Sequence, residues 1–214
     1  MESTLEILFE SIAKIRILRL FLQNSERSFA LSEIVSRTQI KRAPCSRELA
    51  KLLRAGLVRQ KMGRVREESG TDQKGDAKKN KSSSLKAKKV KLYFLDTNFS
   101  LLSELSELVL KSAATDRKRI LQQVRRLGKI KLAIISGIFI NNDTTRTDLF
   151  IVGDDIKQKA LGRFLQQIES ELGKPIQYTV MDMEEYKYRM NMYDRFLRDI
   201  LERPHEKLIN KLHS

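Results

Sequence analysis

The side chains of residues 41–54 carry the clearest chemical pattern in this chain. Leu49, Leu52 and Leu53 recur at helical spacing and predict a face that turns toward a core. Basic and hydroxyl side chains fall on another face, where they could neutralise phosphates and donate hydrogen bonds to base edges. The residues of this polar face, together with the two that precede it, are Lys41, Arg42, Ser46, Arg47, Ala50, Lys51 and Arg54. A helix with such a face has the size that enters a DNA major groove, so the pattern predicts double-stranded DNA as a partner.

Two short helices around a tight turn would position this face. The first is expected over residues 32–38, with Ser32 as its N-cap and apolar side chains turned inward. The second is expected to open at Ala43-Pro44 and to close near Ala55-Gly56, because proline suits the first turn of a helix and glycine suits its C-terminal cap. The chain turns between them at residues 39–41, so the segment has the pattern of a helix-turn-helix.

Helical and strand patterns flank this motif on both sides. Residues 4–23 carry an apolar stripe at helical spacing and predict a first helix. Residues 57–62 and 90–95 predict two antiparallel strands. The order of three helices followed by two strands predicts a winged helix.

This overall pattern resembles the arsenic-repressor-like winged-helix superfamily of regulators, over roughly residues 5–112. The resemblance implies that residues 41–54 form the recognition helix and its approach, and that residues 59–91 form the wing. Arg42, Ser46, Arg47 and Lys51 are then expected to contact the groove. The side chains expected to contact phosphate are Arg59, Lys61, Arg64, Arg66 and the lysines from Lys78 to Lys89, which include Lys86 and Lys88.

The predicted wing contains a long insertion at residues 68–89, rich in Lys, Ser, Gly and Asp. Such a segment cannot bury enough apolar surface to offset its ordering entropy, so we expect it to be disordered in the free protein. One hypothesis is a flexible basic arm that contacts phosphates or the minor groove. The other is a solvated insertion that is merely tolerated at the tip of a loop.

A further helix is expected over residues 98–113, and its apolar surface is wider than packing on one side requires. In winged-helix regulators a helix after the wing commonly forms a two-fold dimer interface, so the resemblance implies a homodimer. The alternative is that this helix packs against the next domain of the same chain.

The remaining residues alternate between helices and short apolar strands and predict a small α/β domain. Helices are expected over residues 116–127, 155–172 and 184–201, and strands over residues 130–136, 148–152 and 176–181. Asp154 and Asp155 are expected to cap the second of these helices. The predicted fold is therefore α+β, with domains at residues 1–113 and 114–214.

Residues 130–153 resemble the core of minimal nucleotidyltransferase domains, which carry Gly-Ser after one strand and Asp-x-Asp at the start of the next. Gly137 takes the glycine position, Ile138 the serine position and Asp148 that of the second aspartate. Arg146 stands where the first aspartate belongs, and two-metal chemistry needs several carboxylates. The resemblance thus implies a scaffold without a metal or transferase activity, kept as a ligand sensor or a dimerisation platform. Gly137, Arg146 and Asp148 are the candidate remnants of a nucleotide site.

The charge of the chain is unevenly distributed. The formal net charge is +15, and residues 1–91 contain 22 Lys/Arg against 10 Asp/Glu, whereas residues 92–214 contain 20 against 17. The basic character therefore belongs to the half that carries the helix-turn-helix pattern, as a phosphate partner requires.

Cysteine content and hydropathy predict the compartment. No secretory or membrane-spanning pattern is visible, and the single Cys45 cannot form an internal disulfide, so we expect a cytoplasmic protein. Cys45 itself is expected to pack as a small residue, and the alternative is a redox-sensitive thiol. His205 and His213 lack further ligands at useful spacing, so no metal site is expected.

Together these patterns predict a dimeric, sequence-specific transcriptional regulator that needs no cofactor, with a nucleotide or small molecule as its unidentified effector. One alternative is an active nucleotidyltransferase that the winged helix targets to its substrate. A third hypothesis is an interaction module whose winged helix binds protein.

Overall fold

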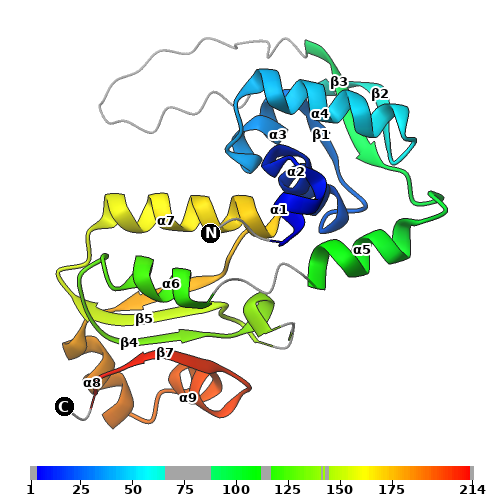
Figure 1. The fold of residues 1–214 in the computed structure, drawn as a ribbon. Coiled ribbons are helices and arrows are strands. Elements are labelled where there is room, and N and C mark those ends of the chain that lie inside the picture. Colours follow the sequence, from blue (N-terminus) through cyan, green and yellow to red (C-terminus); the bar gives the residue numbers. More distant parts are fainter. Residues whose placement is uncertain (1–3, 66–87, 112–116, 141, 143–144, 213–214) are drawn as a thin grey trace, which may run out of the picture.

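The computed structural model describes residues 4–65, 88–111, 117–140, 142 and 145–212. Over these residues the protein is α+β and contains two sheets, each with helices packed on it (Figure 1). The predicted fold class is confirmed at this level. The expected boundary between residues 113 and 114 lies outside the described residues.

The N-terminal part combines a bundle of helices with a small antiparallel sheet of order β1-β3-β2. Its elements are α1 (Thr4–Phe9), α2 (Ile12–Leu22), β1 (Ser28–Ala30), α3 (Leu31–Thr38), α4 (Arg42–Arg54), β2 (Val58–Val65), β3 (Lys88–Leu95) and α5 (Leu102–Lys111). Apolar side chains from all the helices and the inner sheet face meet around α2, whose Ile17 and Phe21 are almost fully buried. Helix α2 is therefore the centre of this core.

The predicted helix over residues 4–23 is two helices. Glu10 adopts a left-handed conformation with a φ of 52°, and Ser11 then caps α2 by accepting a hydrogen bond from the Lys14 amide at 3.1 Å. The apolar spacing continues across this break even though Leu8 and Ile12 on either side of it are 68% and 44% exposed. Hydrophobic spacing alone therefore does not reveal the boundary.

The start of α3 also differs from the prediction. The N-cap is Ala30 and not Ser32, which lies inside the helix and is exposed. The reason is β1, a three-residue strand that pairs with β3 and delivers the chain directly into α3. This strand was not predicted, since three residues are too few to show alternation.

The two predicted strands of the basic half are confirmed and form a longer ladder than expected. β2 and β3 pair in antiparallel register from Val58 opposite Leu95 to Val65 opposite Lys88. The expected disordered insertion reached residue 89, but Lys88 and Lys89 belong to β3. Residues 66–87, on which the rest of that prediction falls, lie outside the described residues.

Helix α5 begins at Leu102, four residues after the expected start at residue 98, and its expected last two residues lie outside the described part of the chain. The Asp96 carboxylate accepts a hydrogen bond from the Asn98 amide at 3.2 Å, so the chain turns before the helix begins. Val109 is buried in the core, whereas Leu101 and Leu108 are 59% and 50% exposed. The helix thus packs on one side and leaves a second apolar side open, as its width predicted.

The C-terminal part is a sheet of order β6-β5-β4-β7 with helices on both faces. Its elements are α6 (Arg117–Val124), β4 (Lys129–Ile135), the 3-10 helix η1 (Gly137–Ile140), β5 (Leu149–Asp154), α7 (Gln158–Leu172), β6 (Tyr178–Met181), α8 (Met183–Asn191), α9 (Arg195–Glu202) and β7 (Glu206–Asn210). β4 is antiparallel to β5 and β7, while β5 and β6 are parallel and connected through α7. In Figure 1, α6 and α7 lie on one side of the sheet and α8 and α9 on the other.

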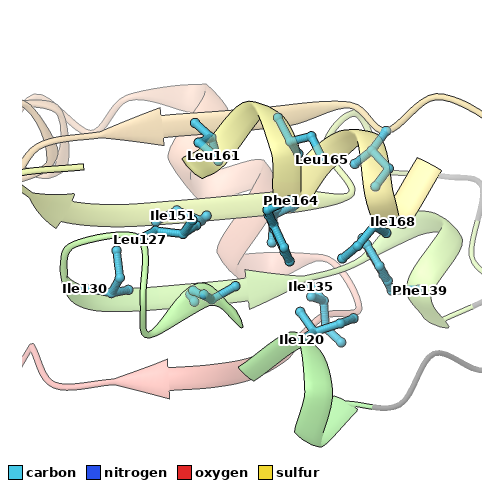
Figure 2. Close-up of a cluster of buried hydrophobic side chains, with 14 of the residues drawn as sticks. Ile120, Leu127, Ile130, Ile135, Phe139, Ile151, Leu161, Phe164, Leu165 and Ile168 are labelled. Carbon is cyan, nitrogen blue, oxygen red and sulfur yellow. The ribbon is translucent and has the colours of Figure 1, made fainter. Parts of the chain in front are cut away.

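Alternation along the strands divides the C-terminal core between the two faces. Leu149 and Ile151 belong to the buried cluster beneath α6 and α7, which also contains Phe164 and Ile168. Figure 2 shows Ile151, Phe164 and Ile168 in this cluster. The intervening Phe150 and the following Val152 point toward α8 and α9. Both faces of β5 are therefore buried, which explains its continuous apolar sequence.

Two predictions for the C-terminal part are wrong. Asp154 and Asp155 do not cap α7, whose N-cap is Lys157; Asp155 instead pairs with Lys129 at 2.8 Å. The long helix expected over residues 184–201 is two helices, because Tyr193 is left-handed at a φ of 52° and Asp194 caps α9 through the Leu197 amide. The short strand β7, which completes the sheet, was not predicted.

The two parts meet where the C-terminal end of α7 lies against α2 (Figure 1). Arg19 donates a hydrogen bond to the Glu171 carbonyl at 2.9 Å, and Asn24 donates one to the Gly173 carbonyl at 2.8 Å. Gly173 has a φ of 82°, and a Cβ there would lie 2.5 Å from the carbonyl carbon of Arg19. Only glycine allows this close approach of the two backbones.

A cluster of charged side chains surrounds the same junction. The Glu171 carboxylate lies 2.5 Å from Arg119 of α6 and 3.7 Å from Arg16 of α2. Arg16 also donates a hydrogen bond to the Thr38 carbonyl at 3.1 Å, at the end of α3. One guanidinium thus connects the end of α3 with α7.

Candidate nucleic-acid interface

Helix α4 presents its polar side to solvent because its apolar residues are spaced to face α2. Cys45, Leu49 and Leu52 are buried, with at most 7% of each residue exposed. Pro44 lies in the first turn, as predicted, and Gly56 follows the helix in a left-handed conformation with a φ of 81°. The predicted helix and its two ends are confirmed to within a residue or two.

Every exposed charged side chain of α4 is positive. The exposed cations are Arg42, Arg47, Lys51 and Arg54, and Lys41 precedes them as the exposed N-cap residue. Arg47, Lys51 and Arg54 are separated by four and three residues, so they share one face of the helix. Ser46 is half-buried at the edge of that face. The structure therefore groups Arg47, Lys51 and Arg54 on one face, while Lys41 and Arg42 lie at the start of the helix.

The one carboxylate of α4 is directed inward. Glu48 is only 9% exposed, and it lies 3.9 Å from Lys14 of α2 and 2.8 Å from Lys51. Lys51 is thereby held against its own helix, and part of its charge is compensated. No described carboxylate pairs with Arg42, Arg47 or Arg54 within 4 Å, so these three present uncompensated charge within the described surface.

The first turn of α4 adds donors to this surface. No described side chain caps the helix there, and Lys41 takes the N-cap position with extended backbone. Uncapped amides at a helix N-terminus together with adjacent cations favour a phosphate oxygen.

The register of β2 and β3 separates the remaining predicted cations onto two faces. Residues directly opposite each other in an antiparallel ladder share a face, and successive residues alternate. Arg64 lies opposite Lys89, and Lys91 opposite Met62, on the face that carries the buried Val58 and Leu95. These three cations are exposed, so they extend the inner face of the sheet beyond the core.

Arg59 and Lys61 lie on the opposite face and have partners of their own. The Arg59 guanidinium lies 2.6 Å from the largely buried Asp96 carboxylate. The Lys61 ammonium lies 5.1 Å from the centre of the Phe94 ring, a cation–π contact. The structure therefore does not group these two predicted phosphate contacts with Arg64 and Lys89.

Opposed cations are unfavourable in an isolated ladder. Arg64 and Lys89 are directly opposite, and a like-charge pair in that position destabilises a sheet. An anion placed between them would remove the repulsion. Lys91 was not selected from the sequence, and its signal was available: it lies two residues from Lys89 and so on the same face of a strand. Arg66 and Lys86 lie outside the described residues, and Lys88 is placed only through its backbone.

Cys45 lies at the start of α4, where a reactive thiol would need access to solvent. The residue is completely buried, and burial raises the pKa of its thiol. A raised pKa keeps the sulfur protonated and poorly nucleophilic. The packing interpretation of Cys45 is therefore the one that its environment supports.

The proposed remnant of a nucleotide site has a different internal chemistry from a metal site. Gly137 and Asp148 are adjacent, and a Cβ on Gly137 would overlap the Asp148 carboxylate. One Asp148 oxygen accepts the Ile138 amide and the other accepts the Gln177 amide, both at 2.9 Å. Both oxygens thus hold backbone, joining the end of β4 to the start of β6.

The other positions of that motif add no second carboxylate. Arg146 is exposed and lines a small depression with Asp199 and Arg203. Asp182, which follows β6, caps α8 through the Glu185 amide at 2.7 Å. Among the described residues, no group of three or more His, Cys, Asp or Glu side chains is placed to hold a metal ion.

Comparison with known proteins adds no assignment. None of the protein-family models, curated proteins or solved structures compared with this chain matches it. Within the described residues, no helix has both the length and the apolar character that crossing a bilayer demands.

Proposed function

We propose that this protein is a cytoplasmic, dimeric, sequence-specific DNA-binding transcriptional regulator, in which residues 4–111 act as a winged helix and α4 as its recognition helix. The observation that carries the proposal is the uniformly positive exposed face of α4, whose single carboxylate is buried. Exposed i,i+4 pairs of opposite charge would stabilise an isolated helix better, and a polyanionic partner explains why α4 lacks them.

The β2–β3 ladder supports the proposal as a wing. Arg64, Lys89 and Lys91 lie on the sheet face that also packs against the helices, and their mutual repulsion is relieved by phosphate. Arg59 and Lys61, engaged with Asp96 and Phe94, contribute less in this scheme. Phosphate contacts from the wing would add affinity, while Arg47 and its neighbours on α4 would supply base contacts.

We assign no transferase activity to the C-terminal part and propose that it serves sensing or assembly. The support is Asp148, whose two oxygens are occupied by backbone amides, and the absence of a second carboxylate at Arg146. In-line transfer of a nucleotidyl group needs carboxylates that are free to hold two metal ions.

The experiment is duplex binding by fluorescence anisotropy, with a sequence selected from fragmented genomic DNA, at about 50 and about 200 mM salt. We expect log affinity to fall by about 0.9 per log unit of salt for each phosphate that is neutralised. Arg47→Ala should weaken binding of the selected duplex most, and Arg163→Ala, an exposed arginine of α7, should leave it unchanged.

A charge reversal in the wing gives an independent check. Lys89→Glu converts the repulsive pair with Arg64 into an attractive one, so it should stabilise the fold by about 0.2–1 kcal/mol while weakening DNA binding. Salt-independent binding, or no binding to any duplex, would contradict the proposed function. Incorporation of labelled nucleotide that Asp148→Asn abolishes would favour the transferase instead.

A further inference from the structure

A cavity of about 230 Å³ lies between the end of α3 and the end of α7. One wall consists of residues 36–39, which close α3 and begin the turn toward α4. The other wall consists of the last turns of α7 and residues 173–175, and Leu20 of α2 also lines it. One wall therefore belongs to the N-terminal part and the other to the C-terminal part, and the cavity lies at the junction between α2 and α7.

The walls carry charges of both signs, and two of them, Arg37 and Glu169, are held by neighbouring groups. Arg37 is held by Glu33, at 2.9 Å from its Nε, and Lys174 lies in the opposite wall. Glu169 is fixed by the Ile176 amide, which donates to its Oε1 at 3.0 Å. The amide of Gln39 and the hydroxyl of Ser36 add neutral polar groups. Charges that are already ordered lose little entropy on binding a ligand of complementary charge.

Volume and charge together select the class of ligand. The cavity is large enough for several waters or for one small organic molecule. A carboxylate would match Arg37, whose charge Glu33 balances only in part, together with Lys174. An ammonium group would match Glu169. We propose that this cavity binds a small zwitterion of the free amino-acid class.

Such a ligand would touch the segment that leads into α4. Gln39, the left-handed residue that ends α3, lines the cavity, and Arg16 bonds the neighbouring Thr38 carbonyl while facing Glu171. Occupancy would therefore change how the turn before α4 rests on α7. This regulatory step depends on the proposed DNA binding, whereas ligand binding itself does not.

Thermal unfolding of the full chain with each of the twenty free L-amino acids in turn tests the site. Acetate and ethylammonium chloride are the single-charge controls. At about ten times its Kd, a bound amino acid should raise the midpoint by about 3–6 °C. Ser36→Leu should abolish the shift by filling the cavity, and Ser32→Leu, an exposed serine of the same helix outside the cavity, should preserve it.

Glu169→Gln provides a second variant that keeps an oxygen for the Ile176 amide and removes the charge. In this variant, the amino-acid concentration needed for the same rise in the unfolding midpoint should be at least about tenfold higher than in the wild type. A shift by no amino acid, an equal shift by acetate, or full retention in both Ser36→Leu and Glu169→Gln would overturn the proposal.

DNA affinity measured with and without the bound amino acid then tests the regulatory step. A change of about 5- to 150-fold is expected for coupled sites. Amino-acid binding with unchanged DNA affinity would remove the coupling and keep the site. Amino-acid binding by a protein that binds no duplex would remove the proposed function and keep the site.

Discussion

Replacing Asp148 tests whether this carboxylate stabilises the fold or serves as a ligand to a metal ion. Its two oxygens accept the Ile138 and Gln177 amides at 2.9 Å each, and Asp148 is half-buried. Asp148→Ala removes both acceptors at once. Asp148→Asn keeps one oxygen but turns its amide nitrogen, a donor, toward the other backbone N–H.

The expected loss follows from these two bonds. A hydrogen bond to an ionised group contributes about 1.5–3 kcal/mol, so two give an upper range of about 3–6 kcal/mol. Gln177 is exposed, and water can replace part of its lost bond. We therefore expect Asp148→Ala to reduce the free energy of unfolding by about 2–4 kcal/mol and Asp148→Asn by about 1–3 kcal/mol.

Urea unfolding followed by far-UV circular dichroism measures this loss as a lower midpoint at an unchanged slope. The matched control is Asp182→Ala, which removes an exposed aspartate that accepts one amide at the start of α8. Loss of such a cap costs about 1 kcal/mol. The order of stabilities should be wild type, Asp182→Ala, then Asp148→Ala.

A wild-type midpoint for Asp148→Ala would refute the reasoning, because it would mean that neither amide depends on the carboxylate. An unchanged urea midpoint for Asp148→Ala, together with Mg²⁺-dependent nucleotide incorporation by the wild type, would favour Asp148 as a metal ligand. A loss smaller than that of Asp182→Ala would also count against the structural assignment.

Two further predictions concern backbone packing and the buried thiol. Gly173→Ala should lower the free energy of unfolding by more than about 2 kcal/mol, because its φ of 82° and its contact with α2 both exclude a Cβ. The control is Gly162→Ala on the open face of α7, which should raise the free energy of unfolding by about 0.5–1 kcal/mol. Equal urea midpoints for the two variants would contradict this prediction. Since burial raises the pKa of Cys45, the stability that its protonated form contributes is complete below the ordinary thiol pKa and is lost as the pH rises through the raised value. A chromogenic disulfide reagent should therefore label Cys45 slowly in the native protein and quickly in urea, and equal rates would show an accessible thiol.

Elements whose boundaries depend on local chemistry were predictable from the sequence. Helix α4 is an example, since Pro44, the leucine spacing and Gly56 each act within one or two turns. The strands β4 and β5 are apolar enough to indicate burial on both faces. In each case the propensity and the tertiary environment favour the same conformation.

Breaks in apolar patterns were not predictable by spacing. α1 and α2, like α8 and α9, are separated by a non-glycine residue in the left-handed region, Glu10 and Tyr193 respectively. The residues that follow them, Ser11 and Asp194, are good N-caps, and this was the local signal for a new helix. The short strands β1 and β7 had no such signal, because pairing with distant strands stabilises them.

The positions of the candidate DNA-contacting side chains were predictable from the sequence on α4, but only in part on the β2–β3 ladder. On α4, helical geometry alone places Arg47, Lys51 and Arg54 together. On the ladder, the sequence treats Arg59 and Arg64 alike, but register and the buried Asp96 separate them. A cation's role depends on which carboxylate the fold brings near it, and that information is not local.

Helix α2 connects the C-terminal part physically to α4. Ile17 and Phe21 of α2 form the core on which α4 rests, while Arg16 and Arg19 contact α7. A displacement of α7 would therefore act on the helix that supports α4. Under the proposed function, a ligand needs only to bind one arrangement of this junction more tightly than another. An arginine at position 146 is compatible with such a role, because differential binding requires fixed contacts and no bond cleavage.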